Sequence, residues 1–576
     1  MAAIKFKSAL GVERGCEDGF GGIDRTADGR RAGKLFSAEN LDLRSDGSLV
    51  SRGAYRQIRE LDGEFRGHFS RGNELYTVVG NAFERTDLSD GSVTTLGVLP
   101  TDSGHAEIFC FRGEVYVHDG AALYRFDGAA LAAVEGYAPY YGMGWNPAYG
   151  GAINEDINYL SDRILISYSV NQAVTSFYLG IEAASIDRVE ISNTVQSVAD
   201  FSLERNADGS PIIRSRSSIT SGEVFFWLTL APEASKKHLL SAPLRSFVFG
   251  NNGGERLCFY IPGRSGYLYC SKPIKSYMQA YSSKTAENEL PIYFARTTEV
   301  CVGSGAYPIS GMAEHYGRAL LFTESNAWCV DFEGEEKNTE YFKPKIFMLN
   351  SAIGSEIQSG SAYCENDPLT YSSGALWRWN SKSGVLDECS ATLVSDSVAD
   401  LLPTDAEELA LLSISGKQSV YIADTEDGEG RMLVYNTRLK AWTVWQGIFA
   451  EKLLSYGGAP AFVCGNALCV FTDTTEKDSE FDGDFAVKTA FSTHFLDFGA
   501  PERTKRSVDL VLYCKLGKSG ADVRFENERG EVRAVYLDGV DGCITERIAL
   551  PRFKKLRVTV ESVAPAEFRS LILSAK

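Results

Sequence analysis

The side chains that could support chemistry are scattered along this chain and match no zinc-binding motif. Six residues are histidines: His68, His105, His118, His238, His315 and His494. No HExxH motif and no i, i+4 pair of histidines occurs, although that spacing is what places two imidazoles on one zinc ion. We therefore expect these histidines at the surface or at the ends of strands.

Nucleophile and nucleotide motifs are also missing. The stretch GRSGY, Gly263–Tyr267, lacks the last glycine of a GxSxG elbow and continues into the strand pattern YLYC, so we interpret it as a hairpin turn. Glycoside hydrolysis needs two carboxylates a few ångströms apart, but acidic residues are so abundant here that their presence indicates nothing. No copy of the Ser-x-Asp-x-Gly-x-x-Trp repeat of sialidase-like propellers occurs. We therefore expect no enzyme activity and no cofactor, and we assign no catalytic, cofactor-binding or metal-binding residue.

One acidic stretch imitates part of a calcium loop. The first half of an EF-hand loop is matched by Asp478, Glu480, Asp482 and Gly483. Position 12 of that loop would be Thr489, however, rather than the glutamate that binds calcium through both oxygens. We interpret the stretch Asp473–Asp484 as an extended acidic linker. The similar run DTEDGEG, Asp424–Gly430, is interpreted as a hairpin loop.

The charge balance argues against specific binding of nucleic acid. The chain has 58 basic and 76 acidic residues, which gives a formal net charge of −18. Affinity for nucleic acid comes mainly from Lys and Arg displacing counterions from phosphates. An acidic wall suits a duct through which DNA passes without sticking. The opening MAAIKFKSALGVERG has no signal-peptide core, and no window approaches the roughly 20 apolar residues that span a bilayer, so we expect cytoplasmic synthesis without membrane insertion.

The cysteines are expected to be reduced. Twelve are distributed over 576 residues, several lie within strand patterns, as Cys110, Cys258 and Cys464 do, and no CxxC pair occurs. In this setting a cysteine behaves as a small buried hydrophobe. The sequence supports neither a disulfide framework nor a zinc ribbon.

The pattern of apolar residues predicts an all-β protein. Tyr, Phe, Val and Thr occur in runs of four to seven residues between Gly, Asn and Asp, and the longest helical pattern is TDAEELALLS, Thr404–Ser413. The stretch NLDLRSDGSLVSRGAYRQI, Asn40–Ile58, is expected to form the first strands. An apolar share of 44% is sufficient for a large core.

A two-strand unit recurs along the chain. FSRGNELYTVVGNAFERTD, Phe69–Asp87, aligns with FCFRGEVYVHDGAALYRFD, Phe109–Asp127, at an offset of 40 residues. In this alignment Leu75 matches Val115, and Phe83 matches Leu123. Related units occur at Tyr316–Phe332, Leu369–Asn380 and Tyr456–Phe471, with turns at Gly80-Asn81, Asp119-Gly120, Ser325-Asn326 and Gly465-Asn466. Because one hairpin cannot bury its apolar face alone, repetition at this period indicates β-propeller blades, although hairpins in another all-β fold would give the same pattern. The strand pattern SVYIAD followed by YNTRLKAWTVW, Tyr435–Trp445, is typical of the end of a kelch-type blade.

Two regions interrupt this repeat. Between Gly142 and Pro232 strand patterns follow one another at about ten-residue spacing, which is enough for a small inserted β-sandwich. After Asp484 long alternating strands indicate a second sandwich. The aromatic run YAPYYGMGW, Tyr137–Trp145, is interpreted as the hinge that packs the insert onto the propeller, with a glycan or partner surface as the alternative.

Several segments resemble a family of propeller-containing tail and virion proteins of bacteriophages. The opening FGGIDRTADGRRAGKLFSAENLDLRSDGSLVSRGAY, Phe20–Tyr55, is similar to the stretch before the first blade of that family. The matching positions are Gly21-Gly22, Asn40-Leu41, Ser48-Leu49 and Arg52-Gly53-Ala54-Tyr55, where Ala54 departs from the commoner form. The segment beginning GGAINEDINYLSDRILISYS at Gly150 resembles the family's inserted domain. The segment AFSTHFLDFGAPERTKR, Ala490–Arg506, and the strands after it resemble the family's closing sandwich.

The resemblance implies a nozzle- or hub-type ring protein of a virion tail, without enzymatic activity. Its partners would be other copies of itself, other tail and neck proteins, and DNA passing non-specifically through a channel. Synthesis would take place in the cytoplasm of a bacterial host. The rival hypothesis is a receptor-binding or polysaccharide-degrading tail protein.

The expected domain order follows from the repeat and its interruptions. We predict an N-terminal arm at 1–39, propeller at 40–141, an inserted β-sandwich at 142–232, propeller at 233–484 and a C-terminal β-sandwich at 485–576. Strands near the N-terminus would complete the last blade, so that both chain ends would close the ring and leave no free edge. The number of blades stays open.

Overall fold

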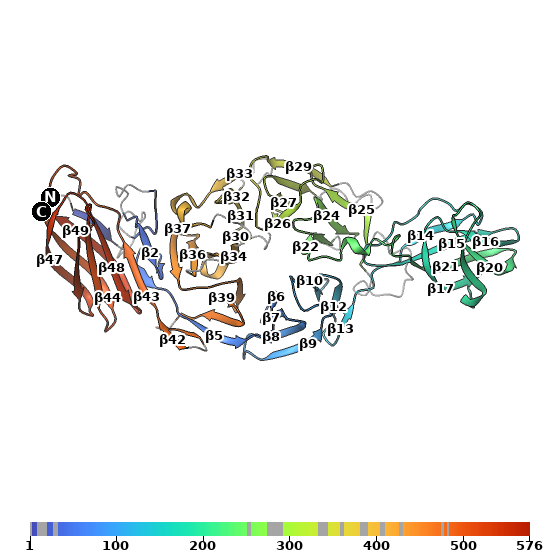
Figure 1. Ribbon diagram of the computed structural model, residues 1–576, viewed down its shortest axis with the longest axis horizontal. Helices are drawn as coiled ribbons and strands as arrows, with labels where there is room; N and C mark the ends of the chain where they lie inside the picture. Colours follow the sequence, from blue (N-terminus) through green and yellow to red (C-terminus); the bar gives the residue numbers. More distant parts are fainter. Residues whose placement is uncertain are drawn as a thin grey trace. The chain divides into compact units, whose positions relative to one another are not determined.

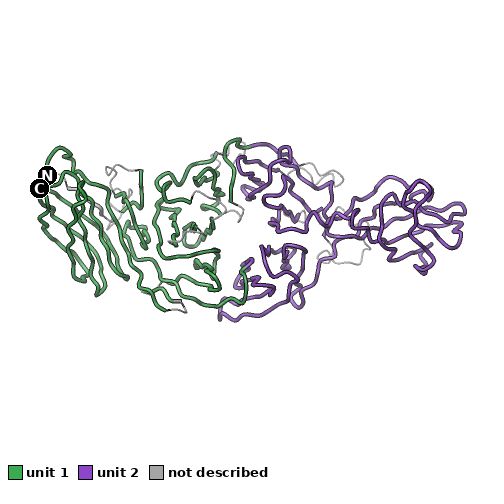
Figure 2. Tube along the Cα trace, in the orientation of Figure 1, with its two compact units in different colours: residues 1–65, 349–576 green, residues 66–348 purple. Residues whose placement is uncertain are grey.

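The protein is nearly all-β, as the sequence predicts. A computed structural model describes residues 3–7, 20–26, 33–249, 255–272, 292–331, 344–357, 362–380, 390–403, 409–424, 430–473, 477–480 and 483–576 (Figure 1). The chain divides into two compact units (Figure 2): unit 1, Met1–Phe65 with Leu349–Lys576, and unit 2, Arg66–Met348. Among the described residues, no helix is long and apolar enough to cross a membrane.

Unit 2 contains four-stranded antiparallel sheets whose consecutive strands are neighbours, as in propeller blades. The first comprises β6 (Phe65–Arg71), β7 (Glu74–Val79), β8 (Ala82–Asp87) and β9 (Val93–Val98). The second comprises β10 (Glu107–Phe111), β11 (Glu114–His118), β12 (Leu123–Phe126) and β13 (Leu131–Ala133). The third comprises β22 (Arg245–Phe249), β23 (Arg256–Tyr260), β24 (Tyr267–Ser271) and β25 (Phe294–Cys301). The fourth comprises β26 (Ile309–His315), β27 (Arg318–Thr323), β28 (Ala327–Asp331) and β29 (Lys345–Asn350).

The repeat found in the sequence corresponds to these sheets. The matched pairs Leu75 and Val115, and Phe83 and Leu123, are all buried. The first turn is a two-residue loop, because Val79 pairs with Ala82 across Gly80-Asn81, and Gly80 has a φ of 53° that glycine adopts without strain. The period of 40 residues therefore marks positions that face the cores of successive sheets.

The insert is a two-sheet sandwich, as predicted. One sheet has the order β14 (Tyr140–Trp145), β15 (Arg163–Val170), β21 (Gly222–Leu230), β17 (Ala183–Ile191) and β18 (Thr194–Gln196). The other has the order β16 (Val174–Tyr178), β20 (Pro211–Ile219) and β19 (Phe201–Arg205). Tyr168, Phe177 and Phe226 fill the space between the sheets, with ring centroids 5.1 to 5.8 Å apart.

Unit 1 contains further four-stranded meanders. One comprises β30 (Ala362–Cys364), β31 (Asp367–Ser372), β32 (Ala375–Asn380) and β33 (Ser390–Leu393). A second comprises β34 (Leu409–Ile414), β35 (Ser419–Asp424), β36 (Arg431–Asn436) and β37 (Ala441–Gln446). The described part of the helical pattern Thr404–Ser413 lies in β34, which pairs along its length with β35, because tertiary pairing overrides local propensity. Residues 404–408 lie outside the described residues.

The last meander is completed by a strand from near the N-terminus, as predicted. β38 (Lys452–Tyr456), β39 (Ala459–Cys464) and β40 (Ala467–Phe471) are consecutive. The fourth strand is β5 (Tyr55–Glu60), which pairs antiparallel with β40 from Tyr55 opposite Phe471 to Glu60 opposite Ala467. The sheet therefore joins residues from both ends of the sequence.

The C-terminal sandwich also takes strands from the N-terminal region, so the described parts of the predicted arm at 1–39 are not a separate element. One of its sheets has the order β3 (Leu41–Leu43), β4 (Leu49–Ser51), β49 (Ala566–Ala575), β44 (Lys505–Leu516) and β47 (Asp541–Phe553), and β1 (Ala3–Lys7) also pairs with β49. In the other, β2 (Ser37–Glu39), β43 (Lys488–Ser492), β48 (Leu556–Val563), β45 (Ala521–Asn527) and β46 (Val532–Leu537) follow one another. β2 also pairs with β37, so this sheet continues directly into a meander. The boundary expected at residue 40 is wrong for β3 and β4, because their alternating apolar residues are buried in the sandwich.

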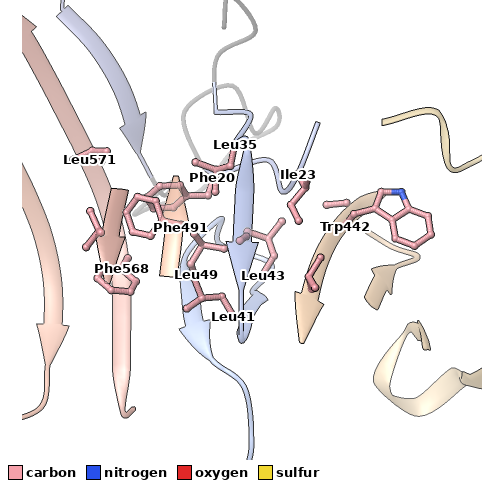
Figure 3. Close-up of a cluster of buried hydrophobic side chains, with 14 of the residues drawn as sticks. Phe20, Ile23, Leu35, Leu41, Leu43, Leu49, Trp442, Phe491, Phe568 and Leu571 are labelled. Carbon is pink, nitrogen blue, oxygen red and sulfur yellow. The ribbon is translucent and has the colours of Figure 1, made fainter. Parts of the chain in front are cut away.

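Apolar side chains of the N-terminal segment are part of the hydrophobic core of unit 1. Figure 3 shows Phe20, Leu35, Leu41 and Leu49 among side chains of the C-terminal sandwich. The Phe20 and Phe491 rings lie 5.3 Å apart, at an angle typical of edge-to-face pairs. The early strands are therefore core elements, and Leu41 and Leu43 of β3 are both buried in this core.

Candidate functional site

Two Arg-Gly dipeptides, one in each unit, lie at buried joints between sheets. Arg52 and Arg66 are each only 3% exposed. Burial of a guanidinium is expensive unless its donors are satisfied. The partners of each arginine therefore define what each joint does.

Arg52 joins the N-terminal segment to the chain after the last meander through a buried ion pair. Its Nη1 donates to Asp478 Oδ1 at 2.9 Å and its Nη2 donates to Asp478 Oδ2 at 2.6 Å. The same carboxylate accepts the backbone N–H of Tyr55 at 2.9 Å. A bidentate pair of this kind fixes orientation as well as distance. Residues 426 positions apart are thus held in one geometry.

Asn40 extends this joint to the sandwich and to β37. Its side-chain oxygen accepts from Arg52 Nε and from the Gln446 backbone N–H, both at 2.8 Å. Its amide nitrogen donates to the Lys488 carbonyl at 2.8 Å. The φ of Asn40 is 53°, a conformation that asparagine tolerates better than most side chains. One residue therefore links β37, β43 and the segment before β5.

The residues after Arg52 fit the same joint. A Cβ on Gly53 would lie 1.8 Å from the carbonyl oxygen of Thr472, so no larger residue fits there. Thr472 donates its backbone N–H to the Ala54 carbonyl at 2.8 Å. Tyr55 is 4% exposed, and its ring packs edge-on against Phe462 at 5.0 Å. The motif Arg52-Gly53-Ala54-Tyr55 is therefore explained by packing around one buried carboxylate.

Arg66 solves the same problem without any carboxylate among its hydrogen-bond partners. Its Nε donates to the Gly104 carbonyl at 2.8 Å, and its Nη1 donates to the carbonyls of Gly80 and Thr101 at 2.9 and 2.7 Å. Its Nη2 donates to Thr101 Oγ1 at 2.8 Å and to the Asp119 carbonyl at 2.7 Å. All the N–H donors of the guanidinium are thereby used. The turns at Gly80 and Asp119, which belong to successive sheets, are held by one side chain.

Gly67 repeats the close approach seen at Gly53. A Cβ on Gly67 would lie 1.9 Å from the carbonyl oxygen of Ala106, which precedes β10. Ala106 donates its backbone N–H to the Arg66 carbonyl at 3.0 Å. Both Arg-Gly pairs therefore bring two backbone segments together where no Cβ fits.

A further joint in unit 2 holds the stem of the insert. Asn158 is fully buried, and its Nδ2 donates to the carbonyls of Tyr137 and Ile292 at 2.8 and 2.9 Å. Its Oδ1 accepts the backbone N–H groups of Leu160 and Phe294 at 3.1 and 3.0 Å. The hinge interpretation of Tyr137–Trp145 is confirmed for Tyr137 at the stem, whereas β14 is a strand of the insert itself.

Charged side chains also connect the sheets that begin with β10 and β22. Glu107 Oε1 accepts from the backbone N–H and the hydroxyl of Ser246 at 3.0 and 2.7 Å. Its other oxygen lies 2.8 Å from His105 Nε2 and 3.5 Å from Arg245 Nη1. Burial alone would raise the pKa of Glu107, but His105, Arg245 and the Ser246 hydroxyl together lower it to about 2. The carboxylate is therefore charged over the whole physiological range.

These joints hold segments together and leave little capacity for reaction. Both oxygens of Asp478 and every nitrogen of the Arg52 and Arg66 guanidinium groups are engaged in hydrogen bonds. A general acid or base needs a proton site that faces a substrate. Within the described parts of the chain, no group of three or more His, Cys, Asp or Glu side chains is placed to hold a metal ion.

The structure corrects the linker interpretation of Asp473–Asp484. β41 (Lys477–Glu480) and β42 (Gly483–Ala486) form a hairpin, and Ser479 pairs with Arg56 of β5. Asp478 is 6% exposed and binds Arg52, so it does not belong to a solvated loop. The linker interpretation is wrong because nothing within this acidic stretch indicates that one of its carboxylates pairs with an arginine 426 residues away. Asp482 and residues 425–429 of the second acidic run lie outside the described residues.

The histidine expectation is confirmed for His118 and His315, which are the last residues of β11 and β26, although they are only 1% and 2% exposed. It is wrong for His494, which is 7% exposed and lies beyond the end of β43. His118 Nδ1 accepts the Gly120 N–H at 3.2 Å and its Nε2 donates to the Leu240 carbonyl at 2.9 Å, which fixes the tautomer. Burial lowers the pKa of His118 to about 4, so this ring stays neutral at physiological pH.

The structure also describes the predicted hairpin turn, most of the cysteines and three buried polar residues that the sequence did not indicate. Gly263–Tyr267 connects the antiparallel strands β23 and β24, as predicted. No disulfide links the cysteines that the structure describes; Cys258 is buried, Cys110 and Cys464 are half-buried, and Cys543 is exposed. The roles of Asp478, Arg66 and Asn158 were missed. The Arg66-Gly67 dipeptide lies inside β6, and Arg-Gly also occurs at Arg71 and Arg112, so the dipeptide gave no specific signal for Arg66. Nothing local marks Asp478 or Asn158 either.

Comparisons with known proteins give no family. No family model and no curated protein matches the chain. Solved structures with some likeness include the extracellular domain of a one-component system from B. thetaiotaomicron, with 9% identity and a TM-score of 0.26 over 92% of this chain and 78% of that one. An exo-β-1,3-galactanase from Phanerochaete chrysosporium has 10% identity and a TM-score of 0.19 over 92% and 100%. Scores this low carry no argument about the function of this chain.

Proposed function

We propose that the protein is a structural, non-enzymatic component of a bacteriophage tail, of the nozzle or hub type. The observation that carries the proposal is the Arg52–Asp478 joint. It interlocks the N-terminal segment with the end of the last meander and, through Asn40, with the C-terminal sandwich. A protein that must stay folded while neighbouring subunits and DNA exert force on it gains from such interlocking.

The sequence resemblance and the joint support the proposal through the same residues. The segment Phe20–Tyr55 carries the likeness to phage tail proteins, and it also supplies Asn40, Arg52, Gly53 and Tyr55 to the joint. In this role several copies would pack side by side in a ring, attach other tail proteins, and present an acidic wall to DNA that passes without sticking. The acidic excess, 76 residues against 58, suits such a wall.

Purified virions test the proposal. Immunogold electron microscopy with antibodies against this chain should label a ring at the tail, and mass spectrometry should find the chain in particles in multiple copies. Its absence from washed particles would contradict the proposal. Release of reducing ends from host envelope polysaccharide by the isolated protein would instead support the rival, polysaccharide-degrading function.

A further inference from the structure

A small cavity lies beside the Arg52 joint in unit 1. It has a volume of about 180 Å³ and is bounded by β3, by the meander β34–β37 and by the meander that β5 completes. Pockets for drug-sized ligands usually measure about 300–1,000 Å³. This cavity is therefore of a size for one extended side chain rather than for a cofactor.

The walls of the cavity are aromatic. Tyr421, Trp445 and Phe471 line it and are each at most 6% exposed. The Trp445 and Phe471 ring centroids lie 4.7 Å apart, and Tyr421 lies 5.4 Å from Trp445. Aromatic faces attract cations, most strongly where water is excluded. The Arg52 guanidinium lies 5.9 Å from the Trp445 ring centroid and 5.7 Å from that of Phe471, so these rings already tolerate one cation nearby.

One carboxylate in the cavity wall has no cationic partner. Trp445 Nε1 donates to Asp42 Oδ1 at 3.1 Å, and among the residues that the structure describes no ion pair reaches the Asp42 carboxylate. The nearby charges are otherwise matched: Arg52 pairs with Asp478 at 2.6 Å and Lys417 pairs with Asp473 at 2.8 Å. The cluster of three carboxylates and two cations therefore carries one unbalanced negative charge, on Asp42.

We propose that this cavity binds the side chain of a lysine presented by another protein. The alkyl stem would lie against the aromatic walls, and the ammonium group would pair with Asp42. Lysine fits better than arginine, because one Asp42 oxygen already accepts from Trp445 and a guanidinium fork favours two free carboxylate oxygens. The Lys417–Asp473 pair, with Asp473 83% exposed, lies at the rim. The inference is independent of the proposed tail function, because it concerns only the chemistry of this cavity.

The protonation of Asp42 gives the binding a pH dependence. Burial raises the pKa of Asp42 to about 6, while the Trp445 hydrogen bond, Arg52 and Lys417 oppose the rise and Asp473 adds to it. Tyr421 is the other titratable group that lines the cavity near Asp42, and burial keeps it neutral by raising its pKa. Asp42 is thus charged above about pH 6 and neutral below it. Affinity for an ammonium group should rise with pH across this range.

Calorimetric titration of the full-length protein tests the proposal without a known partner. The probe is Nα-acetyl-lysine N-methylamide, and the matched neutral probe is the norleucine analogue. At pH 7.5 the lysine probe should bind and the norleucine probe should bind at least about tenfold more weakly. Lowering the pH to 5 should weaken the lysine probe by about the same factor and leave the norleucine probe unchanged.

The substitution Asp42→Asn provides the second arm. It keeps the shape of the side chain and removes the charge, so affinity for the lysine probe should fall at least about tenfold and lose its pH dependence. Circular dichroism and the melting temperature check that the variant is folded. If Asp42→Asn does not fold, the comparison of the two probes and the pH series on the unaltered protein decide the question. Absence of binding by the lysine probe, or equal binding of both probes, would overturn the inference.

Discussion

The two Arg-Gly joints use the same dipeptide but satisfy the buried guanidinium in opposite ways. Arg52 in unit 1 is neutralised by the Asp478 carboxylate, which comes from a segment 426 residues away. Arg66 in unit 2 keeps its charge among neutral oxygens, all supplied by residues within 53 positions. A Cβ added to the glycine that follows each arginine would lie less than 2 Å from a carbonyl oxygen.

The difference shows what each joint has to achieve. Arg66 connects sheets that are consecutive in the chain, so backbone carbonyls of nearby turns are already within reach. Arg52 has to bring together segments from opposite ends of the sequence, where closing a long loop costs entropy. A charged partner adds attraction and direction that carbonyls alone do not supply. The joint between segments far apart in the sequence thus relies on an ion pair. The joint between consecutive sheets relies on hydrogen bonds to backbone carbonyls.

Removal of the N-terminal segment should have the largest effect. Deleting residues 1–58 removes Asn40, Arg52 and most of β5, which leaves Asp478 without its partner and exposes the edge of β40. We expect unit 1 to lose its cooperative thermal transition, a loss well above about 5 kcal/mol. Differential scanning calorimetry measures this, and the joint at Arg66 should keep a transition for unit 2. A melting profile identical to that of the full chain would contradict the role given to these strands.

Removal of either partner of the Arg52–Asp478 pair should destabilise the protein more than removal of both together would suggest. Arg52→Met and Asp478→Leu should each destabilise the protein by about 3–5 kcal/mol, because each leaves a buried charge without a partner. The double variant should lose clearly less than the sum, since neither charge remains. Urea unfolding of the four proteins in this cycle gives the coupling free energy.

Arg66→Met should behave differently from Arg52→Met. It leaves the half-buried carbonyl oxygens of Gly80 and Thr101 without this donor, at about 1–3 kcal/mol each, and no single second substitution removes both. The Asp119 carbonyl keeps its hydrogen bond from the Thr101 hydroxyl. Strict additivity in the Arg52 and Asp478 cycle would mean that the ion pair is not the source of the coupling.

The sequence predicted more of the fold than of these joints. Alternation and turn residues identified the meanders, the insert and the C-terminal sandwich, because those signals are local. The fourth strand of the last meander was also expected, from the need to leave no free edge. The linker interpretation of Asp478 is wrong, since the burial of Asp478 depends on its pairing with Arg52. The amino-acid sequence of an acidic stretch does not show whether one of its carboxylates is buried. Long-range pairs of this kind leave no periodic signal in a single sequence.

The glycines at the two joints should respond alike. Gly53→Ala and Gly67→Ala each force a Cβ to within 2 Å of a carbonyl oxygen, so the backbone must separate. We expect a loss of about 3 kcal/mol for each, at the upper end of the range for overpacking. Gly416→Ala is the matched control, because nothing lies within 4 Å of its Cβ and its φ is not positive. Its unfolding free energy should change by less than about 0.5 kcal/mol, and equal effects at all three glycines would refute the close-approach argument.

Arginine-to-lysine exchange is the finest test of the comparison, and Arg52→Lys should have the smallest effect of the joint variants. Arg52→Lys keeps the attraction to Asp478 but loses the fork geometry and the hydrogen bond from Nε to Asn40, so we expect a loss of about 1–2 kcal/mol. Arg66→Lys keeps a charge that has no carboxylate among its described hydrogen-bond partners, and lysine has three donors for the five oxygens that Arg66 serves. At least two of these oxygens therefore lose the donor at residue 66, although the Asp119 carbonyl keeps the Thr101 hydroxyl. The loss there should be larger, about 2–4 kcal/mol. Urea unfolding of both variants at low and high salt checks the order, and a greater loss for Arg52→Lys would show that fork geometry, rather than charge, carries the unit 1 joint.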